Sequence, residues 1–248
     1  MLELKDKLII ALDVDSLDKA EYFVNILYPA VKFFKIGSQL FTACGPEAVK
    51  MVGKKGARVF LDLKFHDIPN TVYLSVTTGT ASNILITPVS VEGIAGSVKD
   101  IMSPPVFMMT VHTMGGVEML KAAVRGAKEK AEELGISKPF IVGVTRLTSD
   151  ENDKNTREDV LRAARLAKDA GLDGVVCAVN EATLVREELG KDFIIVTPGI
   201  RPKGYAPDDQ KRTATASEAL AAGADYIVVG RPILEAKDPL KAFNDLIG

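Results

Sequence analysis

Hydrophobic residues follow two alternating patterns along this 248-residue chain. Short runs rich in β-branched and aromatic residues, typical of buried strands, alternate with longer stretches whose apolar residues are spaced for one helical face. Such alternation indicates parallel βα units. The predicted strands are Leu8–Asp13, Val31–Ile36, Val59–Lys64, Ile84–Thr87, Val106–His112, Phe140–Thr145, Gly174–Ala178, Phe193–Thr197 and Tyr226–Gly230. The predicted helices are Ser16–Leu27, Pro46–Lys54, Val117–Leu134, Arg157–Ala170, Glu181–Leu189 and Ala216–Ala222.

This order of elements favours an α/β fold, a (β/α)8 TIM barrel, in which about 250 residues form one domain. No linker or shift in composition divides the chain, so residues 1–248 are expected to form a single domain. An open doubly wound sheet is the alternative, but no Gly-x-Gly-x-x-Gly follows the first strand, where such a sheet would bind a dinucleotide.

The region between the third strand and Val106 does not fit a barrel simply, because the pattern gives nine strands where a barrel needs eight. Either Ile84–Val89 is not a barrel strand, or the region is an insertion outside the barrel. Residues 75–80, Ser-Val-Thr-Thr-Gly-Thr, are poor helix formers. We therefore expect an extra segment after the third strand.

Composition excludes several classes of function. With 31 Lys and Arg against 33 Asp and Glu, the net charge of -2 gives no electrostatic basis for binding nucleic acid or an anionic membrane. The first residues lack a signal-peptide pattern, and no apolar run approaches the roughly 18 residues of a transmembrane helix. Cys44 and Cys177 are isolated, which predicts two reduced cysteines in a cytoplasmic protein.

Charged residues gather at the ends of the first three predicted strands. Asp62 and Lys64 are two residues apart on the third strand, so their side chains share one face. Burying such a pair is unfavourable unless the charges pair or take part in chemistry. Asp67 begins the next loop, while Asp13 and Lys35 end the first two strands. We expect one charged cluster at the carboxyl rim, although structural ion pairs are the alternative.

The C-terminal third contains a candidate phosphate site. A strand ends at Gly230, Arg231 follows, and a short helix is expected from Pro232. Backbone N–H groups and a guanidinium there would form a site of the kind that barrels build after their last strands. The alternative is a turn glycine beside a solvated arginine.

Two loops and two histidines complete the candidates. The long loop at 198–212 carries Arg201 and Gln210, which could close on an anionic ligand, or the loop could simply be solvated. Thr145 and Thr148, at the exit of the fifth expected barrel strand, could donate hydrogen bonds to a neutral polar substrate edge. His66 and His112 lack partners at metal-ligand spacing, so we expect structural histidines and no metal site.

The segment Asp62-Leu-Lys-Phe-His-Asp-Ile-Pro-Asn-Thr71 resembles the signature of the orotidine 5′-monophosphate decarboxylase family. Its shorter core, Asp-x-Lys-x-x-Asp, is shared with related sugar-phosphate barrel enzymes. The resemblance covers most of the chain, because further matching residues follow in the family's order. These are Asp13, Lys35, Val111–Gly116, Val144–Ser149, Pro198–Arg201, Gln210 and Val229–Arg231.

The resemblance implies a homodimeric barrel that converts orotidine monophosphate to UMP and CO2, the last step of UMP biosynthesis, without metal or organic cofactor. Lys64 would protonate the carbon that loses the carboxylate, and Asp62 would lie against that carboxylate. Lys35 and Asp67 would complete a network of alternating charges. An adjacent carboxylate favours the ammonium form of lysine, and a fixed positive charge stabilises a ring carbanion.

The resemblance also implies roles for the other site residues. Asp67 and Thr71 would reach the partner subunit's site, Asp13 would bind ribose hydroxyls, and Thr148 would contact the pyrimidine. The phosphate would be held by four residues, of which Gln210 could also touch the base: Arg201, Gln210, Gly230 and Arg231.

The chain departs from the family's pattern after Thr71, where the path to the next strand is about twice the usual length. We expect an insertion at approximately residues 74–95. A metal-dependent hexulose-phosphate synthase or a keto-gulonate-phosphate decarboxylase is the runner-up, and a non-catalytic barrel that binds a phosphate ligand is a third possibility.

Overall fold

The computed structural model describes residues 4–82, 105–146, 156–205 and 213–247. Eight parallel strands, hydrogen-bonded in sequence order from β1 to β8 and back to β1, form a closed barrel. This confirms the (β/α)8 fold and excludes the open sheet. The strands are β1 (Leu8–Ala11), β2 (Phe33–Gly37), β3 (Arg58–Phe65), β4 (Val106–His112), β5 (Phe140–Val144), β6 (Gly174–Val176), β7 (Ile194–Thr197) and β8 (Tyr226–Val229).

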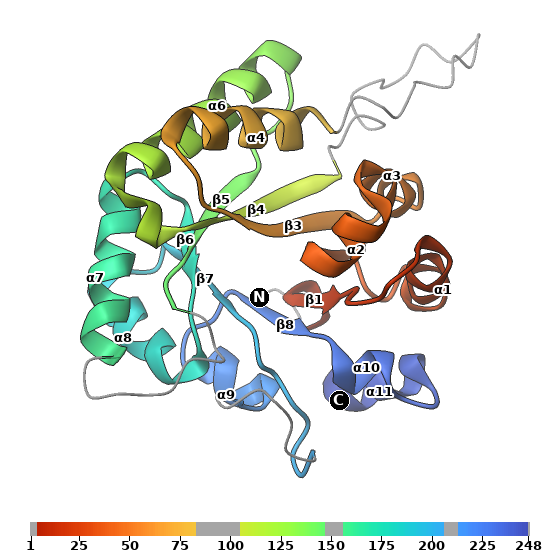
Figure 1. The fold of residues 1–248 in the computed structure, drawn as a ribbon. Coiled ribbons are helices and arrows are strands. Elements are labelled where there is room, and N and C mark those ends of the chain that lie inside the picture. The colour runs from red at the N-terminus through yellow and green to blue at the C-terminus, as the bar shows by residue number, and fades with distance from the viewer. Residues whose placement is uncertain (1–3, 83–104, 147–155, 206–212, 248) are drawn as a thin grey trace, which may run out of the picture.

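The helices lie outside the strands (Figure 1). They are α1 (Leu17–Leu27), α2 (Ser38–Cys44), α3 (Pro46–Lys54), α4 (Pro69–Ala81), α6 (Gly116–Leu134), α7 (Thr156–Asp169), α8 (Val179–Leu189), α9 (Ala216–Ala221), α10 (Arg231–Leu234) and α11 (Pro239–Ile247). The Thr215 side chain and Glu218 form a capping box at the start of α9. Within the described residues, no helix combines the length and apolar character needed to cross a membrane.

Helix α4 corrects the expectation that residues 75–80 are poor helix material. The threonine hydroxyls of this segment are satisfied within the helix, since Thr80 donates to the carbonyl oxygen of Val76 at 2.9 Å. Gly79 permits close packing, because a Cβ there would lie 2.6 Å from the sulfur of Met109. Tertiary packing against β4 and α6 thus outweighs weak helix propensity.

The boundaries of the expected insertion also change. Its first residues, 74–81, belong to α4, the helix that connects β3 to β4. Residues 83–95 lie outside the described part of the chain. The eight places of the barrel are filled without the ninth expected strand, Ile84–Thr87, because β3 pairs directly with β4.

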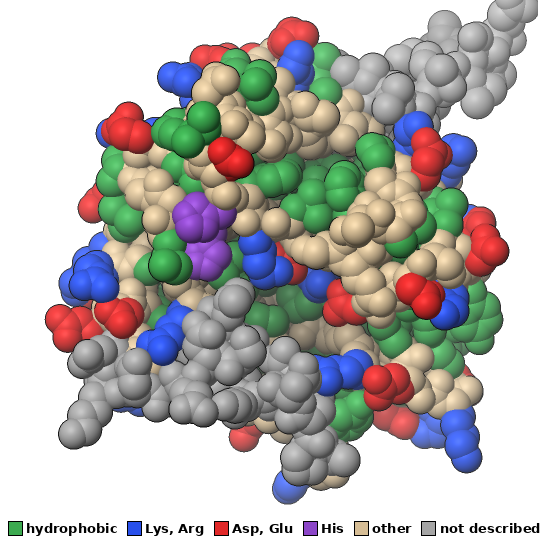
Figure 2. All heavy atoms as spheres, in the orientation of Figure 1, with side chains coloured by type: hydrophobic (Ala, Val, Ile, Leu, Met, Phe, Trp, Pro, Cys, Tyr) green, Lys and Arg blue, Asp and Glu red, His purple; other side chains and the backbone are tan. Residues whose placement is uncertain are grey.

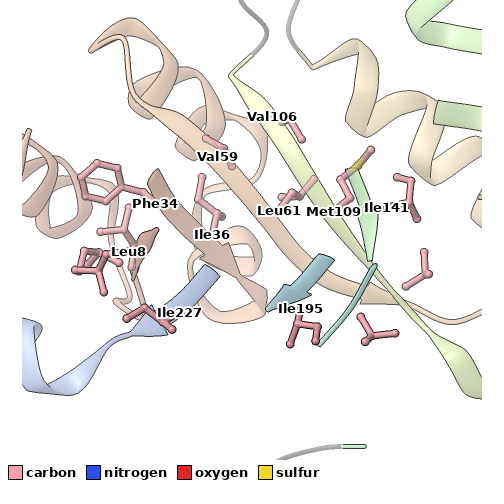
Figure 3. Close-up of a cluster of buried hydrophobic side chains, with 14 of the residues drawn as sticks. Leu8, Phe34, Ile36, Val59, Leu61, Val106, Met109, Ile141, Ile195 and Ile227 are labelled. Carbon is pink, nitrogen blue, oxygen red and sulfur yellow. The ribbon is translucent and has the colours of Figure 1, made fainter. Parts of the chain in front are cut away.

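Alternation along the strands divides the core into two layers. One layer lies between the strands and the helices and includes Leu8, Phe34, Ile36, Leu61, Met109 and Ile141 (Figure 3). The other fills the barrel interior and consists of Ile9, Ala11, Phe60, Phe107, Met108, Val142, Val196 and Val228. On β3, Phe60 faces inward and Leu61 outward, so Asp62 and Lys64 continue the inward series toward the carboxyl end.

Candidate active site

Four charged side chains at the carboxyl ends of β1, β2 and β3 form a continuous line of alternating charge. The Nζ atom of Lys35 lies 2.9 Å from Oδ1 of Asp13 and 3.5 Å from Oδ2 of Asp62. The same Asp62 oxygen accepts a hydrogen bond from Nζ of Lys64 at 2.9 Å. The structure therefore brings together Asp13, Lys35, Asp62 and Lys64, as alternation and strand order predicted. Basic and acidic side chains gather at a hollow on this face (Figure 2).

The middle of this line is shielded from water. Asp62 is only 7% exposed. Burial acts to raise its pKa, but the positive charges of Lys35 and Lys64, with hydrogen bonds from Lys64 and Thr110, outweigh burial and hold the pKa below its usual range. Burial likewise acts to lower the pKa of Lys35, and the carboxylates of Asp62 and Asp13 reverse that effect. Both groups are therefore charged at neutral pH.

The backbone of β3 leaves regular strand geometry at Lys64. This residue has φ of 51°, the one positive φ among the described non-glycine residues. The pairing with β4 shifts register between Leu61 and Phe65. The N–H of Lys64 donates to the hydroxyl of Thr110 at 2.8 Å, and that hydroxyl donates to Oδ1 of Asp62 at 3.0 Å. Sequence reasoning missed Thr110, although its inward position near the end of β4 was a signal.

Gly37 is a second residue that sequence reasoning missed. A Cβ atom built on it would lie 2.8 Å from Nζ of Lys35 and 3.3 Å from Oδ1 of Asp13. These distances are too short for a side chain without movement of the ion pair. A glycine at the end of β2 therefore leaves room for the contact between Asp13 and Lys35.

The second half of the site lies after β7 and β8. Gly230 precedes α10, and Arg231 is the first residue of that helix. Arg201 is only 8% exposed, and its Nη1 donates to the carbonyl oxygen of Ile200 at 2.9 Å. Among the described residues no side chain caps α10. Pro232 has no N–H, and those of Ile233 and Leu234 donate to the carbonyl oxygen of Gly230 at 2.9 and 3.1 Å, so a ligand at this end would meet the backbone at Gly230 and Arg231.

Both halves line one cavity of about 280 Å³. It holds five cationic side chains against two carboxylates, in a chain whose net charge is -2. The site can therefore attract an anion that the whole chain would not. One of these cations, Arg146, lies two residues after the end of β5 and was missed by sequence reasoning. The charged residues that line the cavity, with Gly230, are Asp13, Lys35, Asp62, Lys64, Arg146, Arg201, Gly230 and Arg231.

Some expected site residues lie elsewhere. Asp67 and Thr71 are exposed and do not line this cavity. The Asp67 carboxylate accepts a hydrogen bond from the N–H of Ile68 at 2.6 Å, so it does not join the cluster of its own subunit. Thr145 donates to the carbonyl oxygen of Val176 at 2.9 Å and does not line this cavity. The other two expected substrate contacts, Thr148 and Gln210, lie outside the described residues.

The two histidines stack on each other beside the site. Their ring centroids are 5.4 Å apart at an interplanar angle of 22°, and Nδ1 of His112 accepts a hydrogen bond from the N–H of Met114. The contact joins the loop after β3, at His66, to the end of β4. Among the described residues, no group of three or more His, Cys, Asp or Glu side chains is placed to hold a metal ion.

The lowered pKa of Asp62 gives a prediction for stability. The Asp62 carboxylate binds a proton more weakly in the folded protein than in the unfolded chain. Ionised Asp62 therefore stabilises the fold at pH values above the unfolded pKa of this carboxyl group, which is about 3.9. That contribution is lost as the pH falls through the lower folded value. The difference in free energy of unfolding between wild type and Asp62→Asn should therefore be constant above pH of about 5 and shrink in more acidic solution. Urea titrations across this range measure it, and a difference that grows on acidification would contradict the assignment.

Comparisons with known proteins agree with this geometry. Residues 6–246 match the model of the Orotidine 5′-phosphate decarboxylase / HUMPS family. Orotidine 5′-phosphate decarboxylase of Moorella thermoacetica is 43% identical over 247 residues, which cover 96% of this chain and 89% of that protein. The Vibrio campbellii protein of the same name is 41% identical over 250 residues, 96% of each chain. The crystal structure of orotidine 5′-phosphate decarboxylase from Lactobacillus acidophilus has a TM-score of 0.76 and 34% identity over 96% of both chains. The chain therefore belongs to the orotidine 5′-phosphate decarboxylase / HUMPS family.

Proposed function

We propose that this protein decarboxylates orotidine 5′-monophosphate to UMP and CO2, the last step of UMP biosynthesis, without a metal or organic cofactor. One observation carries the proposal: a buried line of alternating Asp and Lys charges shares a cavity with two arginines and a glycine suited to phosphate. The relatives that cover nearly the whole chain are named for this activity. A cytoplasmic location fits Cys44 and Cys177, neither of which forms a disulfide.

The two halves of the cavity support one orientation for the bound nucleotide. The guanidinium groups of Arg201 and Arg231, with backbone N–H at Gly230, hold the phosphate. Asp13 lies between the halves, since its Oδ2 is 3.6 Å from the position a Cβ of Gly230 would occupy. It is therefore placed to accept hydrogen bonds from ribose hydroxyls. Thr148 contacts the pyrimidine, and Gln210 assists at the phosphate and the base.

This orientation puts the reacting carbon beside Asp62 and Lys64. The bond from the ring carbon to its carboxylate breaks, its electron pair stays on the ring carbon, and CO2 leaves. The Lys64 ammonium stabilises the carbanion and then transfers a proton to it, giving UMP and a neutral amine that solvent reprotonates. Lys35 and Asp62 act by keeping charge in fixed positions, so little reorganisation is needed as the negative charge develops.

We further propose a homodimer in which Asp67 and Thr71 enter the partner subunit's site and Asp67 completes the charge network there. Support comes from the loop after β3. All residues from His66 to Thr71 are exposed in the single chain, and Ile68 is 67% exposed. A subunit contact over this loop would remove the Ile68 side chain from water together with the polar residues beside it.

Sugar-phosphate enzymes are the alternative, because the shorter Asp-x-Lys-x-x-Asp pattern is shared with them. The purified protein is offered orotidine monophosphate and, separately, hexulose and keto-gulonate phosphates. Loss of orotate absorbance follows the nucleotide reaction, and chromatography of the products follows turnover of the sugar phosphates. We expect UMP and CO2 in equal amounts from the nucleotide and no turnover of the sugars. Turnover of a sugar phosphate with no UMP formed would replace the proposal with the alternative.

A further inference from the structure

We propose that Thr110 is a positioning residue for the reaction, because its hydroxyl joins the Asp62 carboxylate to the backbone of Lys64. The inference rests on the proposed function for its chemical meaning. Thr110 does not line the cavity, so it acts through the two residues that do.

The hydroxyl of Thr110 occupies a position where both of its hydrogen-bonding functions are used. It accepts from the N–H of Lys64 at 2.8 Å and donates to Oδ1 of Asp62 at 3.0 Å. Thr110 is 0% exposed, so water cannot readily take over either contact. A residue that only donates or only accepts could satisfy one of these groups but not both.

These contacts orient a carboxylate that would otherwise be held on one side only. Both lysines approach Oδ2 of Asp62, Lys64 at 2.9 Å and Lys35 at 3.5 Å. Among the described residues, the hydroxyl of Thr110 is the side-chain donor to Oδ1 of Asp62, whereas Lys64 donates to Oδ2. The hydroxyl therefore fixes rotation of the carboxylate, and with it the direction in which its charge faces the cavity.

The same hydroxyl supports the unusual backbone at Lys64. A lysine at φ of 51° adopts a conformation that L-residues rarely occupy, so surrounding contacts must hold it there. The shift of register between β3 and β4 removes regular ladder pairing at this point. The hydroxyl of Thr110 instead accepts a hydrogen bond from the N–H of Lys64. This contact helps to position the backbone from which the Lys64 side chain extends.

The experiment compares Thr110→Val, which keeps the shape and removes the hydroxyl, with Thr110→Ser, which keeps the hydroxyl. For Thr110→Val we expect kcat to fall about 10- to 100-fold, because small misplacements of reacting groups have effects of that size. KM should stay within about threefold, since the proposed phosphate contacts lie after β7 and β8, away from Thr110 on β4. Thr110→Ser should recover most of kcat.

The pH profile separates positioning from simple loss of packing. Asp62 is faced by Lys35, Lys64 and the Thr110 hydroxyl, and the hydrogen bond from Thr110 favours the ionised form. Without that bond the pKa of Asp62 rises, so the acid limb of kcat should move to higher pH in Thr110→Val and not in Thr110→Ser.

Thr80→Val is the matched control. Thr80 is also 0% exposed and donates from its hydroxyl, but it does so within α4, away from the site. This variant should keep the wild-type kcat and acid limb even if it unfolds at a lower temperature. Wild-type kcat and pH profile in Thr110→Val, or equal losses in the Val and Ser variants, would overturn the inference.

A second readout does not depend on turnover of orotidine monophosphate. Carboxyl ¹³C NMR, with the Asp62 signal assigned through Asp62→Asn, follows the titration of this carboxylate directly. A higher pKa in Thr110→Val than in wild type supports the positioning contact, and an unchanged pKa contradicts it. Absence of UMP formation by wild type would instead count against the proposed function.

Discussion

Lys64→Ala should lose nearly all decarboxylase activity while binding of the product survives. In the proposed mechanism the ammonium group both stabilises the carbanion and donates the proton, so losing both effects is expected to lower kcat by at least about 10⁴-fold. The proposed phosphate contacts, Arg201 and Arg231, follow β7 and β8 and are untouched by the change. Steady-state assays with orotidine monophosphate measure kcat, and calorimetric titration with UMP should give a Kd within about tenfold of wild type.

Lys241→Ala is the control for loss of a lysine. Lys241 lies on α11, exposed and paired with Asp245 at 2.5 Å, so its removal also breaks an ion pair but away from the cavity. It should keep wild-type kcat. Near wild-type turnover by Lys64→Ala would exclude Lys64 as proton donor. If wild type and Lys64→Ala bound UMP equally and were equally inactive, the protein would be a non-catalytic barrel that binds phosphate ligands.

Arg231→Ala should weaken substrate binding more than any change at the charged rim of β1 to β3. Charge-assisted hydrogen bonds from a guanidinium to phosphate each contribute about 1.5–3 kcal/mol, so KM is expected to rise about 10- to 100-fold. Inorganic phosphate should also compete less well against UMP in this variant. Arg231→Lys should recover part of the affinity, because an ammonium retains the charge but not the bidentate geometry.

Arg165→Ala tests whether loss of any arginine would have this effect. Arg165 is on α7 and its Nε donates to Glu188 at 2.7 Å, away from the β8 end of the cavity. Its removal should leave KM unchanged. An unchanged KM in Arg231→Ala would show that the phosphate is bound elsewhere.

The inward orientation of Asp62 and Lys64 could be predicted from the sequence because it depends on the geometry of a single strand. A strand places alternate side chains on one face, and parallel strands in a barrel end at one rim, so the two residues meet Asp13 and Lys35 there. To predict that these four side chains meet, one needs to know only the order of the strands along the chain. The same reasoning located Arg231 and Gly230 after the last strand.

Other features depend on how separate segments pack, and no single segment carries them. Thr110 meets Lys64 only because the pairing of β3 and β4 shifts register. The room that Gly37 leaves for the contact between Asp13 and Lys35 follows from where the Lys35 side chain lies. Helix α4 forms although its threonines and glycine disfavour a helix, because its buried face packs on α6 and β4. Asp67 lies three residues from Lys64 in the sequence but does not line the same cavity, because sequence proximity does not show which way a loop turns.

Decarboxylation by EDTA-treated wild-type protein tests the central claim most directly. The protein is incubated with excess EDTA, freed of chelated metal, and assayed for UMP and CO2 at saturating orotidine monophosphate. If the Asp and Lys network performs the reaction with the chain's own groups, the rate should equal that of untreated protein, with one CO2 released for each UMP. Loss of activity on chelation, restored by adding a divalent metal ion, would contradict the account.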